Sequence, residues 1–215
     1  MMIRGFLAVL AGLGLSQTPD PFAIVGRAGR IYRNLTSLQA DFVQVLQDRA
    51  QGDTLTGKGV VSQAGNNYFA MRFSDPPNEA IVVDGKYIWT YTPSTSGNQV
   101  TRSPVPTDPV YGVNLLAKVL DRPQERYQAT YVTRDTTSGV ATDVVELVPL
   151  SQNGPFRRAK LWLGVEDALP RRIELDESPG FRRILTLSRL RTNAPLNKKT
   201  FTFEVPAGAR VVDGI

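Results

Sequence analysis

Hydrophobic residues recur along this chain with two different periods. Asp20 and Pro21 are typical of a helix start, with Asp20 as the N-cap and Pro21 in the first turn. Apolar residues follow at steps of three and four, at Ala28, Ile31, Tyr32, Leu35, Leu38, Phe42, Val45 and Leu46. Because an α-helix turns once every ~3.6 residues, these positions share one face. The pattern predicts a long amphipathic helix, clearest over residues 28–47 because Gly26 and Gly29 weaken its beginning.

From Leu55 onward the apolar residues alternate as they do in strands. Strand candidates are residues 54–62, 68–73, 80–83, 86–91, 127–134, 142–149, 158–163, 170–176, 182–192 and 201–205. Asp84-Gly85 predicts a hairpin with a type I′ turn, in which both central residues have positive φ. Residues 110–120 interrupt the strands as a short apolar helix after a segment, residues 93–109, that contains four prolines. This helix could be a lid on a tether or a simple crossover.

These elements predict a single domain of mainly β structure with helices, an α+β fold. We expect a strongly curved antiparallel sheet covered by the long N-terminal helix and by the short helix. We expect this domain to comprise residues 17–215.

The first sixteen residues have the three parts of a secretory signal. Residues 1–4 include one positive charge, residues 5–15 are uncharged and largely apolar, and Gly14 and Ser16 are small residues at the positions that a signal peptidase reads. We expect cleavage after Ser16, with Thr18 as the alternative. The apolar run is shorter than the ~20 residues that a membrane span needs, and a buried N-terminal helix is the other interpretation. No cysteine follows the run, so we do not expect the chain itself to be lipidated.

Composition narrows the possible chemistry. The chain contains no histidine and no cysteine, which excludes disulfides and thiolate sites and removes the commonest general base. The acid pairs Glu166-Asp167 and Asp176-Glu177 occupy expected turns, where carboxylates are usually solvated. We therefore expect no enzymatic activity, no metal and no cofactor. A lipid hydrolase built on serine and lysine is the enzyme alternative.

Charge gives little evidence of a nucleic-acid partner. Without residues 1–16 the chain carries 24 Lys and Arg against 20 Asp and Glu, a net charge of +4. Arg157-Arg158, Arg171-Arg172 and Arg182-Arg183 are separate pairs that flank strand candidates, where arginine usually belongs to a solvated face. A nucleic-acid site would need a concentrated basic face with aromatic residues. We expect no nucleic-acid partner.

Four segments of the chain together match the pattern of one known family. The first is Ala28-x3-Tyr32-x2-Leu35-x-Ser37-Leu38-Gln39-Ala40-Asp41-Phe42-x-Gln44, which is similar to that family's first helix. The second is the hairpin Ile81-Val82-Val83-Asp84-Gly85-Lys86-x2-Trp89-x-Tyr91-x-Pro93, followed by Gln99-Val100. The third and fourth are Val145-Glu146-Leu147-Val148-Pro149 and Asn193-x7-Phe201-x-Phe203-x2-Pro206-x-Gly208-x2-Val211. In this order the four segments resemble the LolA family of periplasmic lipoprotein carriers, and the resemblance extends from Ala28 to Val212.

The resemblance implies an unclosed β-barrel with a helical lid around a hydrophobic cavity. It also implies a monomeric periplasmic carrier that takes acylated lipoproteins from an inner-membrane ABC transporter complex and passes them to a possible outer-membrane acceptor. Large apolar residues could line that cavity or form ordinary core. The candidates for cavity residues are Leu35, Leu38, Phe42, Phe69, Met71, Phe73, Tyr87, Trp89, Tyr91, Leu116 and Leu120.

One departure from the family concerns the lid. The family's Arg-Pro, whose arginine is associated with holding the lid closed, would fall at Gly65-Asn66. The resemblance therefore gives no latch for this lid, and a carrier of a different lipidic cargo becomes an option. A further alternative is a periplasmic acyl-binding sensor or regulator of the same fold. Such regulators usually carry an additional C-terminal domain, whereas this sequence ends at Ile215, which favours a carrier.

Overall fold

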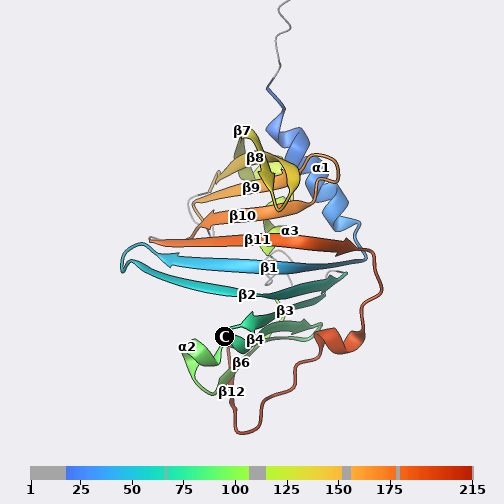
Figure 1. Cartoon of the computed structure of the whole chain (residues 1–215). Helices are drawn as coiled ribbons and strands as arrows, with labels where there is room; N and C mark the ends of the chain where they lie inside the picture. Colours follow the sequence, from blue (N-terminus) through green and yellow to red (C-terminus); the bar gives the residue numbers. More distant parts are fainter. Residues whose placement is uncertain (1–17, 66, 107–114, 152–155, 178–179, 215) are drawn as a thin grey trace, which may run out of the picture.

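A computed structural model describes residues 18–65, 67–106, 115–151, 156–177 and 180–214. Twelve strands in this part of the chain form one sheet (Figure 1). They are β1 (Ser37–Asp48), β2 (Asp53–Ala64), β3 (Tyr68–Asp75), β4 (Pro77–Asp84), β5 (Tyr87–Tyr91), β6 (Gln99–Pro104), β7 (Tyr127–Thr137), β8 (Val140–Pro149), β9 (Arg158–Gly164), β10 (Pro170–Asp176), β11 (Phe181–Thr192) and β12 (Arg210–Asp213).

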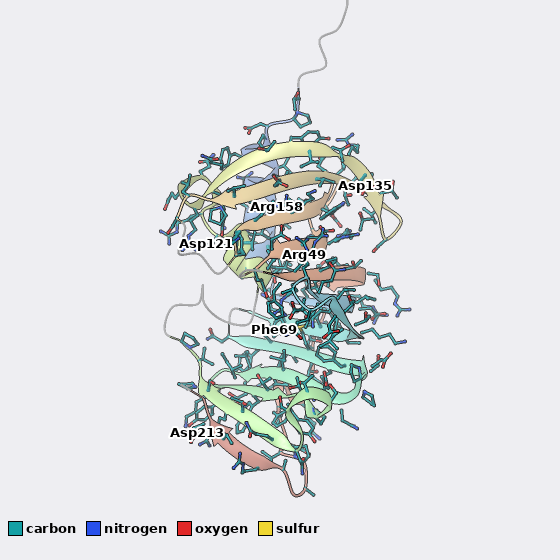
Figure 2. The ribbon with its side chains drawn as sticks, turned by 90° about the vertical axis from the view of Figure 1, so that its left-hand side faces the viewer. Arg49, Phe69, Asp121, Asp135, Arg158 and Asp213 are labelled. Carbon is teal, nitrogen blue, oxygen red and sulfur yellow. The ribbon has the colours of Figure 1, made fainter. Side chains whose placement is uncertain are left out.

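The sheet is curved and does not close. The strand order is β12-β6-β5-β4-β3-β2-β1-β11-β10-β9-β8-β7, and all neighbours are antiparallel except β12 and β6. Asp135 of β7 and Asp213 of β12 lie near opposite edges of the arched sheet (Figure 2). The α+β fold with an unclosed barrel is thus confirmed.

Short helices cover part of the sheet. They are α1 (Pro21–Arg33), α2 (Pro93–Ser96), α3 (Leu115–Leu120), α4 (Pro123–Arg126) and the 3-10 helix η2 (Lys198–Phe201). α1 begins as the sequence predicts, since the Asp20 carboxylate accepts a hydrogen bond from the Phe22 N–H at 2.9 Å. α1 packs against α3, α4 and strands β7–β9. Within the described residues, no helix is long and apolar enough to cross a membrane.

The prediction that the first helix reaches residue 47 is wrong. α1 ends at Arg33, and the following segment forms β1, which pairs with β2 and β11 in the middle of the sheet. Leu38, Ala40 and Phe42 alternate along β1, and each is at most 2% exposed. Their spacing suits a strand as well as it suits a helix, and two neighbouring ladders satisfy the backbone groups on both sides of β1.

One further expectation, a strand over residues 201–205, is wrong. Residues 201–205 are not a strand, because Phe201 ends η2 and residues 202–205 have no regular structure. The sequence pattern also missed the short strands β6 and β12. Of the expected helix 110–120, residues 115–120 form α3 and residues 110–114 lie outside the described residues.

The Asp84-Gly85 hairpin forms, but its turn is not type I′. Gly85 has φ +93°, whereas Asp84 does not have a positive φ. The Asp84 carboxylate instead accepts hydrogen bonds from the N–H groups of Lys86 and Tyr87 at 2.8 and 2.7 Å and from the indole of Trp89 at 2.7 Å. Burial alone would raise the pKa of Asp84, but these hydrogen bonds outweigh it and lower the pKa below its ordinary value.

The two faces of the sheet bury different clusters. The face toward α1 and α3, called the inner face below, carries the main core, which includes Phe42, Leu147 and Ile173. The opposite face, called the outer face, carries a smaller cluster around Val82 and Phe201, where the segment after β11 packs on β3 and β4. A strand therefore contributes alternate residues to two separate environments.

The Gly57-Lys58-Gly59 segment of β2 has a structural role. A Cβ on Gly59 would lie 2.0 Å from the carbonyl oxygen of Arg72, and a Cβ on Gly57 would lie 2.8 Å from the ring of Phe73. That ring meets Phe42 edge-on, with a distance of 4.9 Å between centroids. The glycines let β3 and an aromatic side chain approach β2 closely where the ladder has a bulge.

Candidate functional site

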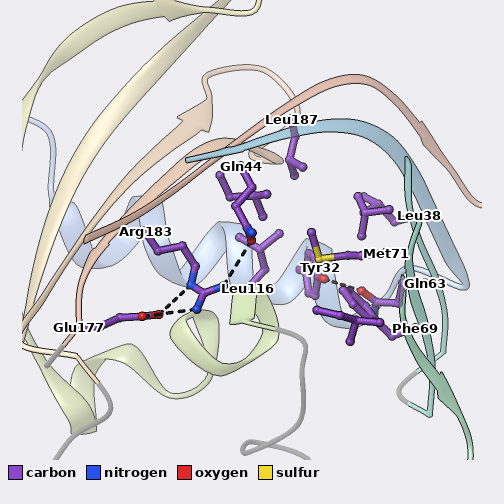
Figure 3. A pocket seen from close by; sticks show the side chains of 13 residues that line it. Tyr32, Leu38, Gln44, Gln63, Phe69, Met71, Leu116, Glu177, Arg183 and Leu187 are labelled. Atoms are coloured by element: carbon purple, nitrogen blue, oxygen red, sulfur yellow. Dashed lines mark hydrogen bonds and ion pairs between the residues drawn. The ribbon is translucent and has the colours of Figure 1, made fainter. Parts of the chain in front are cut away.

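The inner face and the two helices enclose a cavity of about 260 Å³ (Figure 3). Its walls come from α1, α3 and strands β1–β4 and β11, together with one residue that follows β10. The lining residues are Tyr32, Leu38, Gln44, Val61, Gln63, Phe69, Met71, Ile81, Leu116, Glu177, Arg183, Leu185 and Leu187. Most of these side chains are apolar, so the cavity suits a hydrocarbon group more than a polar metabolite.

One polar end of the cavity lies where α1 meets β2. The hydroxyl of Tyr32 donates to Oε1 of Gln63 at 2.5 Å, and Nε2 of Gln63 donates to the carbonyl oxygen of Gly65 at 3.1 Å. Tyr32 is 4% exposed and Gln63 is 6% exposed. These hydrogen bonds join the helix to the loop that contains Gly65, so α1 is fixed to the sheet without an arginine at that position.

The other polar end contains an ion pair. Nε of Arg183 donates to Oε1 of Glu177 at 2.8 Å, and Nη1 of Arg183 donates to Oε1 of Gln44 at 3.3 Å (Figure 3). The Arg183 side chain is 33% exposed and that of Glu177 is 26% exposed. The guanidinium thus lies at the boundary between the apolar cavity and solvent.

The two helices that cover the cavity approach each other through a glycine. A Cβ on Gly29 of α1 would lie only 2.7 Å from the carbonyl oxygen of Leu120 in α3. On α3, Leu116 lines the cavity, and Val119 and Leu120 are buried in the main core. α3 therefore packs against α1 on one side and against the main core on the inner face of the sheet on the other.

The structure divides the predicted cavity residues into three groups. Leu38, Phe69, Met71 and Leu116 lie in the lining. Phe42 and Leu120 belong to the main core beside the cavity, and Leu35 and Phe73 pack against that core.

The third group lies away from this cavity, which corrects the prediction for Tyr87, Trp89 and Tyr91. Trp89 stacks on Phe203 with ring centroids 5.6 Å apart, in the outer-face cluster. Tyr87 and Tyr91 share the parity of Trp89 along β5 and also point to the outer face. The sequence shows that the three rings share a face but does not show which face of the sheet that is.

The contribution of β11 to the cavity was not predicted from the sequence. Leu185 and Leu187 line the cavity together with Arg183, whereas the adjacent Arg182 points to the outer face and pairs with Glu174. The alternation of Arg183, Leu185 and Leu187 was the available signal. The interpretation of Arg182-Arg183 as a pair on a solvated face misses the cavity that Arg183 lines, although both side chains are partly exposed, at 28% for Arg182 and 33% for Arg183.

A family model described as outer membrane lipoprotein carrier protein LolA matches residues 33–204. The chain belongs to the LolA family. Among its relatives, the outer-membrane lipoprotein carrier protein of Albidiferax ferrireducens is 27% identical over 212 residues, covering 95% of this chain and 93% of its own. The protein of the same name from Methylobacillus flagellatus is 29% identical over 186 residues, covering 84% of each chain.

Solved structures share the fold of this LolA-family chain. An uncharacterized conserved protein from Thermus thermophilus superposes with a TM-score of 0.54 at 17% identity, covering 89% of this chain and 98% of that one. Lipoprotein LppX from Mycobacterium tuberculosis superposes with a TM-score of 0.52 at 13% identity, covering 82% and 96%. At these identities the likeness concerns the fold alone.

Proposed function

We propose that this LolA-family protein is a periplasmic carrier that shields the acyl chains of lipoproteins in its cavity and ferries them from the inner to the outer membrane. The observation that carries the proposal is the apolar cavity between the inner face of the sheet and α3. Family membership supports the same role, since relatives along nearly the whole chain are named outer-membrane lipoprotein carrier proteins.

The energetics of acyl chains explain why a carrier is needed. Each methylene removed from water contributes about 0.8 kcal/mol, so a sixteen-carbon chain is worth roughly 12 kcal/mol. Such a chain does not leave a membrane for water at a useful rate unless a protein surface replaces the lipid. Side chains such as Phe69, Met71 and Leu187 supply that surface, and Met71 can adapt its shape to the ligand.

The cavity in this state is smaller than its proposed cargo. Its volume of about 260 Å³ lies below the range of about 300–1,000 Å³ typical of small-molecule pockets. Two or three acyl chains therefore require α3 to move outward or the sheet to open. α3 has six residues, and part of its attachment is the contact at Gly29. In this proposal α3 is the lid.

The proposal includes the partners and the compartment that the family resemblance implies. Residues 1–16 act as a signal peptide that is removed on secretion, and residues 17–215 form the carrier domain. An inner-membrane ABC transporter complex donates the acylated cargo, and an outer-membrane acceptor can receive it. The carrier works as a monomer and catalyses no reaction. The described residues contain no group of three or more acidic side chains that could hold a metal ion.

A reconstitution experiment tests the proposal. The protein from residue 17 onward is mixed with a detergent-solubilised acylated lipoprotein or with its unacylated form, and detergent is then removed. Size-exclusion chromatography should show a one-to-one complex with the acylated form only. Phe69→Gln should weaken the complex, whereas Val60→Gln, on an exposed outer-face position of β2, should not.

Absence of a complex with either form, in a protein that is folded by circular dichroism, would remove the carrier role. A periplasmic sensor that binds acyl groups through the same cavity would then be the better hypothesis. It predicts binding of free lipid without solubilisation of a whole lipoprotein.

A further inference from the structure

We propose that the cavity also binds a free fatty acid in its ionised form, with Arg183 holding the carboxylate. The inference uses the same cavity as the proposed function and goes beyond it in ligand class. Acyl chains of lipoproteins are linked through ester or amide bonds and carry no charge at that end. A permanently charged guanidinium in the lining of an apolar cavity is therefore a feature that such cargo does not require.

Along β11 the cavity runs from the ion pair of Arg183 to apolar side chains in its middle. Arg183, Leu185 and Leu187 occupy alternate positions of this strand, and all three line the cavity. A strand rises about 3.4 Å per residue, so Arg183 and Leu187 are separated by roughly 14 Å along β11. This is a suitable length for a single extended alkyl chain with its carboxylate at Arg183 and its methyl end near Leu187 (Figure 3).

The geometry of Arg183 permits a carboxylate to bind. Among the described residues, Glu177 accepts hydrogen bonds from Nε and Nη2, and Gln44 accepts one from Nη1. An arginine side chain has five N–H groups in a planar fork that matches a carboxylate. The Gln44 contact is long, at 3.3 Å, and the amide is neutral. A ligand carboxylate can replace this amide and gain a charge-assisted hydrogen bond.

Glu177 sets the strength of this site. Its carboxylate neutralises much of the charge of Arg183 and competes with an incoming anion. Binding should therefore be moderate in the native protein and stronger when Glu177 is made neutral. The competing structural explanation is that the ion pair only secures the turn between β10 and β11, where the Glu177 N–H also donates to the carbonyl of Phe181.

Two ligands of equal length separate these explanations. Dodecanoate and dodecanol are titrated against the protein from residue 17 onward, by displacement of a fluorescent fatty acid. Arg183→Gln should weaken dodecanoate binding about tenfold or more while dodecanol changes less than about twofold. Glu177→Gln should strengthen dodecanoate binding several-fold. Arg182→Gln is the matched control, because Arg182 points to the outer face, and it should leave the ratio of the two affinities unchanged.

An unchanged ratio in both Arg183→Gln and Glu177→Gln would overturn the inference and leave the ion pair as a structural contact. If Arg183→Gln does not fold, Arg183→Lys and Glu177→Gln provide the same comparison, since lysine keeps the charge and loses the fork. If neither ligand binds native protein and acylated lipoprotein also fails, the proposed function falls as well. If dodecanol and acylated lipoprotein bind but the ratio does not respond to either substitution, only the fatty-acid inference falls.

Discussion

Replacing Gly29 by alanine should loosen the contact between α1 and α3, whereas the same change at Gly26 should not. Both glycines lie inside α1. A Cβ on Gly29 would lie 2.7 Å from the carbonyl oxygen of Leu120, whereas the nearest atom to a Cβ on Gly26 is Nη1 of Arg30 at 3.6 Å. A contact with a backbone oxygen cannot be relieved by a side-chain rotation. One of the two helices must therefore shift.

The pair of variants isolates the energy of this contact. Alanine is more favourable than glycine inside a helix by about 0.5–1 kcal/mol, and both variants gain this amount. Overpacking costs about 1–3 kcal/mol. We therefore expect Gly26→Ala to stabilise the protein by about 0.5–1 kcal/mol and Gly29→Ala to be less stable than Gly26→Ala by about 1–3 kcal/mol. For a protein of this size, each kcal/mol changes Tm by about 2–4 °C.

Urea unfolding gives the two free energies, and hydrogen exchange of the α3 amides locates the change. Gly29→Ala should exchange faster than the native protein over residues 115–120, and Gly26→Ala should not. If the lid must move for cargo to enter, Gly29→Ala should also take up acylated lipoprotein faster. Equal stability of the two variants, with native exchange in α3, would refute the reasoning that this glycine sets the distance between the helices.

Three other measurements test separate parts of the structure. The fluorescence emission maximum of the two tryptophans should stay constant when a ligand fills the cavity. Trp89 packs in the outer-face cluster, and the indole N–H of Trp162 donates a hydrogen bond to Asp135 away from the cavity. A large shift of the maximum would place one of the tryptophans in the site. Asp84→Asn should destabilise the protein at pH 7 and less at pH 3. The pKa of Asp84 is lower in the folded than in the unfolded protein, so the carboxylate contributes stability that is lost as the pH falls through the unfolded and then the folded pKa. An equal loss of unfolding free energy at both pH values in urea would argue against this. Gly59→Ala should cost about 3 kcal/mol or more in the same assay, because its Cβ would lie 2.0 Å from a backbone oxygen of β3, and a near-neutral result would contradict that packing.

The sequence predicted the strands of the second half of the chain best, because alternation and turn residues agree there. Over residues 37–48 its helix prediction was wrong, because the spacing there fits both a helix and a strand. Leu38 and Phe42 suit a helix when they are grouped with Leu35, and they suit a strand when they are grouped with Ala40. Pairing with β2, which comes next in the chain, and with β11, which is far away in sequence, decides in favour of the strand. No local signal contains that information.

The cavity was only partly predictable for a related reason. Alternation shows which residues of one strand share a face, but the choice of inner face depends on the whole sheet. Size alone favoured the rings of β5, which lie on the outer face. Met71 and Phe69 were found because they are large and lie on the inner face. Arg183 was missed because a charged residue beside another charged residue is normally a surface feature.

The open sheet has a mechanical consequence. In a closed barrel the number of strands and their stagger fix the circumference, so the interior can widen only if hydrogen bonds between strands break. Here β7 and β12 are not joined to each other, and the sheet can change its curvature while every ladder stays intact. If the cavity takes up alkyl chains as we propose, the two edges can spread as the chains enter and come together as they leave. The volume of the cavity would then depend on the ligand that fills it, and the same protein would accept ligands with different numbers of hydrocarbon chains.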